Sequence, residues 1–395
     1  MTTPAISLLR ELLSGRPNAQ TQRVIVDLLV RADAEQLSEM LADPKLTDRL
    51  VGVMSAGRFG PSHFDDLMEL LGVRRRAELD QPARAALIHA LQTGRTSRRD
   101  ELIVRDLFTD VMGADLTVLK NLIDATPNHH DLEELIYRDI DSNEIRQQML
   151  AHIAVQATAV TDLEAKVLSD IDDTTICSLH DRRFPKGVVY PGVVALWEAL
   201  DLGPDSKPRS LGDLTFITAR PADLLGWVED QTRKKLRGAG VSVSSMLTGS
   251  MLHLLSHAGM AEKKIQNITH YHALFPEYRL VFIGDSGQGD VRVGERLLTE
   301  FAGSVDAVLI HDVVGTDAAV RAQYAERGIV FFDTYVGAAV AVHGLGLISD
   351  AGLRAVADAT LDGFHGVPWR TAEQQAQARR LLHRDLAALP VPPRV

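Results

Sequence analysis

The sequence KVLSDIDDT at residues 166–174 joins a short apolar run to a group of acidic residues. Asp170 and Asp172 stand two positions apart, so on an extended chain both side chains would face the same side. Further apolar runs follow, and their β-branched and aromatic residues are typical of buried strands. They read LTFIT at 214–218, LVFI at 280–283, AVLI at 307–310 and IVFF at 329–332.

Helical segments are predicted between these runs, at 191–201, 221–236, 260–275 and 289–301. The first two begin with Pro191 and Pro221, and proline is favoured in the first turn of a helix. This alternation of strands and helices predicts an α/β domain built on a doubly wound parallel sheet. Such folds bind ligands at the carboxyl ends of their strands, so we expect the functional residues there.

The first 160 residues have a different pattern, in which apolar residues recur at spacings of three and four. This spacing predicts an all-helical domain. Residues 24–28 (VIVDL) resemble residues 103–107 (IVRDL) at an offset of 79. A two-copy helical repeat and coincidence among leucine-rich helices both stay open. We therefore predict a helical domain at 1–160, a catalytic domain at 161–350 and a helical tail at 351–395.

Composition limits the function classes that the chain can serve. The 395 residues carry 53 acidic and 42 basic side chains, and the net charge of −11 argues against a general nucleic-acid binder. Acids outnumber bases both before and after residue 160, so neither part is a basic, membrane-seeking domain. The single cysteine, Cys177, excludes a disulfide framework and a thiolate zinc cluster.

The sequence also predicts where the protein resides. No stretch reaches the ~18 consecutive apolar residues that a spanning helix needs. Arg10 and Glu11 interrupt the apolar core that a signal peptide requires. We expect a cytoplasmic protein, and a peripheral contact with a membrane stays open.

Polar residues stand at the ends of the other predicted strands. Thr218 ends the second run, Asp285 and Asp290 follow the third, and the pair Lys263-Lys264 opens the preceding helix. Crowded carboxylates bind hard cations such as Mg²⁺, and a cation there would neutralise phosphate oxygens. Asp170 would then form an acyl-phosphate, Asp172 would transfer protons, and Thr218 and Lys264 would donate to the phosphoryl group.

The order of these motifs resembles the haloacid-dehalogenase phosphatase superfamily. The stretches VLSDIDDT, FITARP, MLTGSMLHLLS, VFIGDSGQGD and FFDTYVGAA are similar to the catalytic domain of phosphatidate phosphatases of the actin-patch-protein type, over about residues 165–350. This resemblance implies a Rossmann-type, haloacid-dehalogenase-like domain and a magnesium-dependent phosphatase. It also implies a substrate that is phosphatidate or a related lipid phosphate monoester.

The resemblance assigns roles to individual residues. Asp170 would be the nucleophile and Asp172 the general acid and base, while Thr218 and Lys264 would bind the phosphate. Lys263 stays open as the alternative lysine. The implied magnesium ligands are Asp170, the backbone carbonyl of Asp172, and Asp285, with Asp290 as a second acid.

The spacing of the motifs bears on the substrate. Asp170 and Thr218 are 48 positions apart, and Thr218 and Lys264 are 46 apart, which leaves room for only a minimal cap. An open site suits a lipid headgroup, and the loop HDRRFPK at 180–186 lies beside it. The candidate substrate-binding residues are Arg182, Arg183, Lys186 and Arg220. The same loop can also be read as a solvated flap.

Other functions stay open on the sequence alone. The substrate can instead be a phosphoprotein or a soluble phosphomonoester. A non-catalytic interaction protein with a phosphatase-like docking domain is a further alternative. The helical domain is expected to bind a protein partner or to self-associate.

Overall fold

The computed structural model describes residues 4–15, 18–55, 63–92, 97–124, 131–160, 165–205, 214–221, 245–249 and 257–390, with the backbone alone for 214–221, 245–249 and 257–260. The chain forms two compact units. The first comprises residues 1–161 together with 273–277, and the second comprises 162–272 and 278–395. Each is described by itself below.

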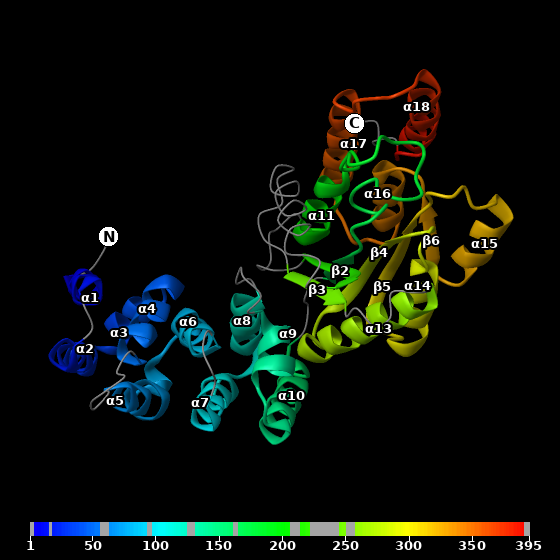
Figure 1. Ribbon diagram of the computed structural model, residues 1–395. Helices are drawn as coiled ribbons and strands as arrows, with labels where there is room; N and C mark the ends of the chain where they lie inside the picture. The colour runs from blue at the N-terminus through cyan, green and yellow to red at the C-terminus, as the bar shows by residue number, and fades with distance from the viewer. Residues whose placement is uncertain are drawn as a thin grey trace. The chain divides into compact units, whose positions relative to one another are not determined.

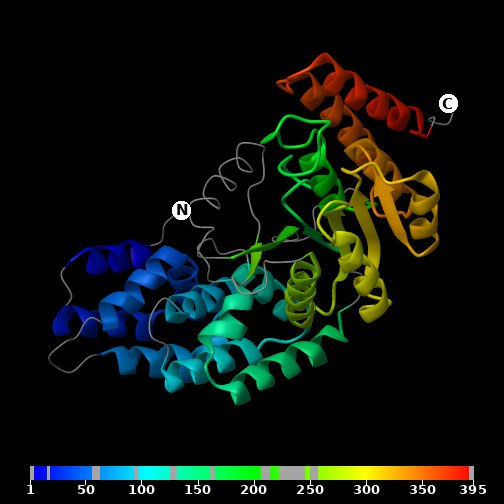
Figure 2. The ribbon, with the colours of Figure 1, turned by 45° about the vertical axis from the view of Figure 1, so that its right-hand side comes forward.

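The first unit is built of helices wherever the structure describes it, coloured blue to teal in Figures 1 and 2. Their apolar stripes predict this, because each helix buries one face: Leu9 and Leu13 of the first helix, for example, are almost fully buried. The α-helices are α1 (Pro4–Ser14), α2 (Ala19–Arg31), α3 (Ala34–Leu41), α4 (Pro44–Ser55), α5 (Phe64–Glu69), α6 (Gln81–Gln92), α7 (Arg98–Thr109), α8 (Gly113–Asp124), α9 (Leu132–Glu134) and α10 (Asn143–Ala157).

The starts of these helices bear on the proposed repeat. Helices α2, α3 and α5 begin at residues 19, 34 and 64, and α7, α8 and α10 begin at 98, 113 and 143. Each later start lies 79 positions after its counterpart, the offset of the sequence similarity. Polar caps help to set these starts, since Asp33 and Ser97 both form capping boxes. The spacing favours a duplicated helical unit, which stays a prediction.

The second unit contains a six-stranded sheet in the order β3-β2-β1-β4-β5-β6 (Figure 1). All neighbouring strands are parallel. The strands are β1 (Ala165–Ser169), β2 (Leu214–Pro221), β3 (Ser245–Gly249), β4 (Arg279–Asp285), β5 (Val305–His311) and β6 (Ile329–Phe332). The prediction of an α/β domain on a parallel sheet is confirmed, and each predicted apolar run lies in a strand. The edge strand β3 was not predicted, because Ser245–Gly249 is short and less apolar.

Helices cover both faces of this sheet. Val167, Ile283 and Leu309 share one apolar core with α11 (Val193–Leu202), α16 (Tyr335–Gly344) and α17 (Asp350–His365). On the opposite face α14 (Asp290–Glu300) approaches closely, because a Cβ on Gly294 would lie 2.5 Å from Val308. Helix α13 (His257–Leu274) precedes β4, and α15 (Ala318–Glu326) precedes β6.

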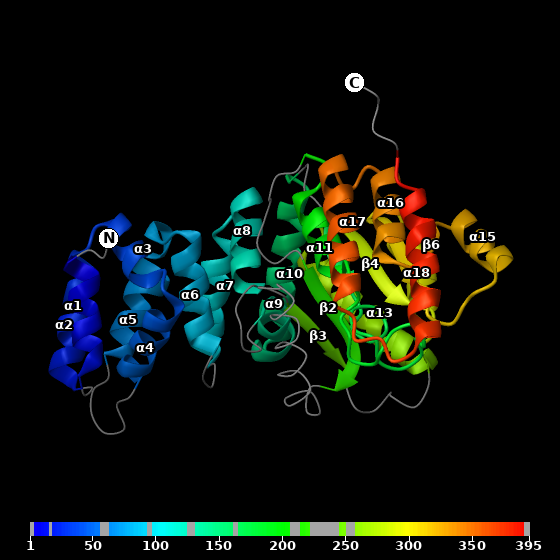
Figure 3. The same cartoon turned by 90° about the horizontal axis from the view of Figure 1, so that it is seen from above.

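The residues that we predicted to form a C-terminal tail belong to the second unit. Figure 3 shows α17 and α18 (Ala372–Ala387) beside α11 and α16. Phe364 of α17 and Leu382 of α18 join the same apolar core as Phe184. These two helices therefore complete the fold that carries the site.

Some sequence predictions are corrected or lie outside the described residues. Pro221 ends β2 and does not begin a helix. The predicted helix 221–236 otherwise falls outside the described residues, as does most of the segment that bears on the size of the cap. In the described ranges, none of the helices combines the length and the apolar character that a bilayer span requires.

Candidate active site

Two neighbouring strands bring acidic residues to the middle of the sheet's carboxyl edge. Asp170 follows β1 directly, and its N–H donates to the Ile283 carbonyl of β4 at 2.9 Å. Asp285 is the last residue of β4. The strand order turns back between β1 and β4, so connections leave in opposite directions and a crevice opens at their ends. Asp170 and Asp285 lie at this point.

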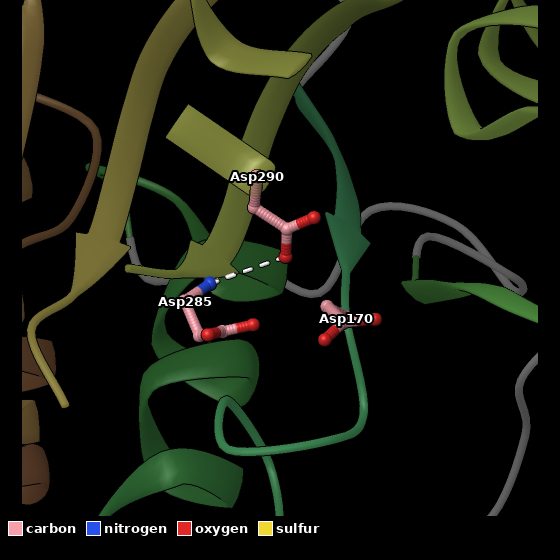
Figure 4. Close-up of side chains that lie close together, drawn as sticks. All are labelled: Asp170, Asp285 and Asp290. Carbon is pink, nitrogen blue, oxygen red and sulfur yellow. Dashed lines mark hydrogen bonds between the residues drawn. The ribbon is translucent and has the colours of Figure 1, made fainter. Parts of the chain in front are cut away.

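A third acid completes a cluster with these two. Asp290 begins α14, and its Oδ2 accepts the N–H of Asp285 at 3.2 Å, the dashed line of Figure 4. Asp170, Asp285 and Asp290 are all buried, and each offers a carboxylate oxygen within 4.8 Å of the others. Gly284 makes this approach possible, because a Cβ there would lie 2.6 Å from the Asp290 side chain. The predicted metal ligands Asp170, Asp285 and Asp290 are thus brought together.

One lysine contacts this cluster. Lys264 Nζ lies 2.8 Å from Asp170 Oδ1 and 2.6 Å from Asp290 Oδ1, and its side chain is buried. Lys263 is instead half-buried and donates to Gln266. Helix α13 therefore directs Lys264, and not Lys263, towards the acids.

The cluster holds three carboxylates against one ammonium, and the pKa shifts reflect this imbalance. Burial raises the pKa of Asp170 to about 7, and the nearby Lys264 only partly opposes the rise. Burial, followed by repulsion from Asp290 and Asp170, raises the pKa of Asp285 well above its ordinary range. Burial disfavours the charged form of Lys264, but the carboxylates of Asp170 and Asp290 outweigh it and raise the pKa of that lysine.

The residues of this cluster fit a hard metal ion. Asp170 Oδ2 is buried and has no hydrogen-bond partner among the described residues. Buried polar atoms are normally paired, so an unpaired carboxylate oxygen between two other acids marks a position for a cation. Divalent cations such as Mg²⁺ take oxygen ligands of this kind. A bound cation would also offset the repulsion that raises the pKa of Asp285.

Asp172, the other half of the predicted catalytic pair, lies outside this cluster of three acids. Its side chain is half-buried, and Ser178 Oγ donates to its Oδ1 at 2.6 Å. The Ser178 hydroxyl also lies 3.1 Å from the Ile176 carbonyl. Ser178 thus fixes the direction of the Asp172 carboxylate, a role that sequence reasoning did not assign.

The part of the chain that carries these acids is similar to a known protein family. Residues 165–312 match the family model for the catalytic domain of phosphatidate phosphatase APP1. This part of the chain is therefore similar to the catalytic domain of that family. Phosphatidate phosphatases are phosphoric monoester hydrolases, so the predicted resemblance and enzyme class are confirmed. No curated protein and no solved structure matches the chain.

Within the part of the chain that matches this family model, Asp173 organises the loop that follows β1. It has a φ of 58°, in the left-handed region that aspartate tolerates better than most residues. Its buried carboxylate accepts the N–H groups of Ser178, Leu179 and His180 at 2.7, 3.0 and 2.5 Å. This was not predicted, although the third acid of DIDD was a visible signal. Asp173 holds Ser178 in place beside Asp172.

Arg183, predicted to bind a substrate headgroup, is buried. It contacts Asp181 at 3.0 Å and Asp333 at 3.4 Å, and Nη2 lies 3.1 Å from His311 Nε2. These carboxylates already neutralise the guanidinium, so the prediction for Arg183 is corrected to a role in shaping the loop. Cys177 is also buried and unreactive in character, because burial raises the pKa of its thiol to about 11.

His311 joins this buried cluster to the loop that bears Asp173. Its Nδ1 donates to the Asp173 carbonyl at 2.7 Å, so the imidazole is neutral with Nε2 accepting from Arg183. Burial, followed by the charge of Arg183, lowers the pKa of His311 to about 4. Neither His311 nor its role was predicted, because a histidine at a strand end has many possible uses.

The remaining predicted substrate residues are placed as follows. Arg182 and Lys186 are exposed on the loop after β1. Thr218 and Arg220 lie near the end of β2, next to β1, and their side chains are outside the described residues. Their roles stay predictions.

Proposed function

We propose that this chain is a magnesium-dependent phosphatase that works through an aspartyl-phosphate on Asp170. The observation that carries the proposal is the buried cluster of Asp170, Asp285 and Asp290, with an unpaired oxygen on Asp170 and Lys264 beside it. It lies in the part of the chain that matches the phosphatidate phosphatase family. The substrate we propose is phosphatidate or a related lipid phosphate monoester.

We further propose that the domain has the haloacid-dehalogenase-like, doubly wound fold. The strand order β3-β2-β1-β4-β5-β6 is the order of doubly wound dinucleotide-binding sheets. The resemblance implies one acid after the first strand and one at the end of the fourth. Asp170 and Asp285 have these positions. This supports the assignment of Asp170 as the nucleophile.

In the first chemical step, a carboxylate oxygen of Asp170 attacks the phosphorus and the bond from phosphorus to the leaving oxygen breaks. Lys264 offsets the negative charge on the phosphoryl oxygens as they pass through the transition state. Asp172, held by Ser178, gives its proton to the leaving alkoxide. A diacylglycerol or other alcohol departs.

In the second step, a water molecule attacks the phosphorus of the aspartyl-phosphate. Asp172, now ionised, takes a proton from that water, and the bond between phosphorus and Asp170 breaks. Inorganic phosphate leaves and Asp170 is regenerated. Asp172 is then protonated again for the next cycle.

Magnesium would be held by Asp170, Asp285 and the backbone carbonyl of Asp172, with Asp290 as the second acid, and would neutralise charge on the phosphate. Thr218 would donate to the phosphate from the end of β2. These assignments rest on the resemblance and on the cluster described above.

A substrate panel tests this function. The purified protein is assayed with Mg²⁺ against phosphatidate in vesicles, soluble phosphomonoesters and phosphopeptides, with and without EDTA. We expect turnover of vesicle phosphatidate that EDTA abolishes and beryllium fluoride inhibits. Turnover of none of these substrates would overturn the enzyme, and a clear preference for soluble esters or phosphopeptides would overturn the lipid.

A further inference from the structure

Two large apolar side chains are exposed at the carboxyl edge of the sheet. Leu179, on the loop after β1, is 54% exposed, and Val314, on the loop after β5, is 56% exposed. Single exposed apolar residues are common on soluble proteins and by themselves mean little. These two line one cleft, together with Arg182.

Residues next to the proposed catalytic acids hold both loops. The N–H of Leu179 donates to Asp173, and the adjacent His180 ring packs on Gly287, where a Cβ would lie 2.8 Å from it. Gly287 in turn donates its N–H to Asp285 at 2.5 Å. The loop that exposes Leu179 is therefore packed on a residue that is hydrogen-bonded to the acidic cluster.

The loop that exposes Val314 is held in a similar way. Ser286, the residue after Asp285, accepts the N–H groups of Val313 and Val314 at 3.0 and 3.4 Å. Ser286 Oγ also donates to Asp312 Oδ1 at 3.0 Å. Both exposed apolar side chains are thus fixed relative to the site rather than carried on free loops.

Positive charge lies beside them. Arg182 is exposed, and no carboxylate of the described residues forms an ion pair with it. Arg384 also lines this cleft, is 54% exposed at its side chain, and pairs with Asp333 and Asp385. Although the chain as a whole is acidic, this rim carries an unpaired cation next to two apolar side chains.

We propose that Leu179, Val314 and Arg182 form a docking rim through which the catalytic domain binds the surface of an anionic phospholipid bilayer. Leu179 and Val314 would enter the acyl boundary, and Arg182 would contact lipid phosphates. The apolar area is small and divided between two loops, whereas a stable protein interface needs about 800 Å² on each partner. This inference rests on the proposed function, since it presents the site to a substrate in the membrane.

Vesicle flotation and two activity assays test the docking rim. The variant Leu179→Gln/Val314→Gln is compared with the wild type and with Leu345→Gln, whose leucine is 52% exposed on the same unit and does not line the cleft. Binding is measured with vesicles of phosphatidylcholine alone and with added phosphatidate or phosphatidylserine. Hydrolysis is measured for vesicle phosphatidate and for soluble para-nitrophenyl phosphate.

We expect the double variant to bind anionic vesicles about tenfold more weakly and to lose a similar factor on vesicle phosphatidate. Its rate on the soluble ester should stay at the wild-type value, and Leu345→Gln should behave as wild type. Arg182→Glu should weaken anionic vesicle binding about fivefold or more.

Other outcomes have distinct meanings. Unchanged vesicle binding by the double variant overturns the docking rim and leaves the phosphatase standing. Equal binding of the wild type to neutral and anionic vesicles overturns the role of Arg182. Wild-type protein that hydrolyses neither substrate overturns the proposed function, and the flotation result still decides whether the rim binds lipid. Loss of soluble activity in the double variant would show that the loops serve the site alone and would also reject the rim.

Discussion

The carboxyl edge of the sheet carries two clusters of aspartates that behave in opposite ways. At β1 and β4, Asp170 and Asp285 outnumber the cation Lys264, and burial raises the pKa of both acids. At β5 and β6, Asp312 and Asp333 are surrounded by arginines, chiefly Arg321, Arg384 and Arg183.

The pKa values at β5 and β6 move in the other direction. Burial acts against ionisation of Asp333, but the guanidinium groups of Arg321 and Arg384 outweigh it and lower its pKa to about 2. Asp312 is also buried, and Arg321 with the hydroxyls of Ser286 and Thr316 lowers its pKa. Burial of an aspartate therefore does not by itself mark a functional site. The excess of acid over base at β1 and β4 is what leaves room for a metal ion.

The largest effect is expected from a substitution in the acid-rich cluster at β1 and β4. We expect Asp170→Asn to lower turnover of the best substrate at least about 1000-fold, because an amide cannot act as the nucleophile. Asp312→Asn is the matched control, because Asp312 is an aspartate that directly follows β5. This variant should keep turnover within about threefold. Initial rates and circular dichroism measure both. Retention of a tenth of wild-type turnover by Asp170→Asn would remove it as the nucleophile.

The second prediction breaks the arginine-rich cluster. Asp333→Asn should lower the free energy of unfolding by about 2 kcal/mol at pH 7, because Arg183, Arg321 and Arg384 each lose one charged partner. The pKa of Asp333 is lowered in the folded state, so its contribution is full above the ordinary range and is lost as the pH falls towards about 2. Chemical denaturation at several pH values measures this. A difference that stays constant from pH 7 to pH 2 would contradict the pairing.

The third prediction concerns His311, which joins Arg183 of the arginine-rich cluster to the loop after β1. Its pKa of about 4 lies below the ordinary value, so the unfolded chain takes up a proton before the folded chain does. Stability from the neutral imidazole is therefore full above about pH 6.5 and is lost as the pH falls to 4. The gap in unfolding free energy between wild type and His311→Gln should shrink by about 3 kcal/mol over that range. A constant gap would show that His311 is not held neutral.

The smallest expected effect is an increase in stability, and it concerns an acid of the cluster at β1 and β4. Asp285→Asn should raise the free energy of unfolding by about 1 kcal/mol in EDTA, because it removes a buried, repelled carboxylate. The same variant should lose the increase in melting temperature that Mg²⁺ gives the wild type. Differential scanning fluorimetry with and without Mg²⁺ tests both. A destabilised variant in EDTA would mean that Asp285 is already balanced without metal.

The sequence was sufficient to predict every strand of the sheet except β3, and the residues that converge at the strand ends. Buried parallel strands are continuous apolar runs, and Asp170 and Asp285 stand at the ends of such runs. The choice between Lys263 and Lys264 needed the structure, because only the rotation of α13 decides which lysine faces the acids.

It was harder to predict which side chains of the loop after β1 are buried. Arg182 and Arg183 are adjacent and identical in chemistry, yet one is exposed and the other is buried between Asp181 and Asp333. Asp333 lies 150 positions further along the chain, and no local pattern relates it to Arg183. Charged contacts over such separations depend on the completed fold, and for the same reason the role of His311 was not anticipated.

The helices α17 and α18 set a condition on how this domain can be synthesised. The match to the family ends at residue 312, but Phe364 and Leu382 lie in the core that also holds Phe184. Arg384 pairs with Asp333, and Thr334 donates to Asp385 at 2.7 Å. A nascent chain that already carries every acid of the site still has an incomplete apolar core until α18 leaves the ribosome. We conclude that a premature stop within α18 would leave the catalytic residues encoded and the domain unfinished.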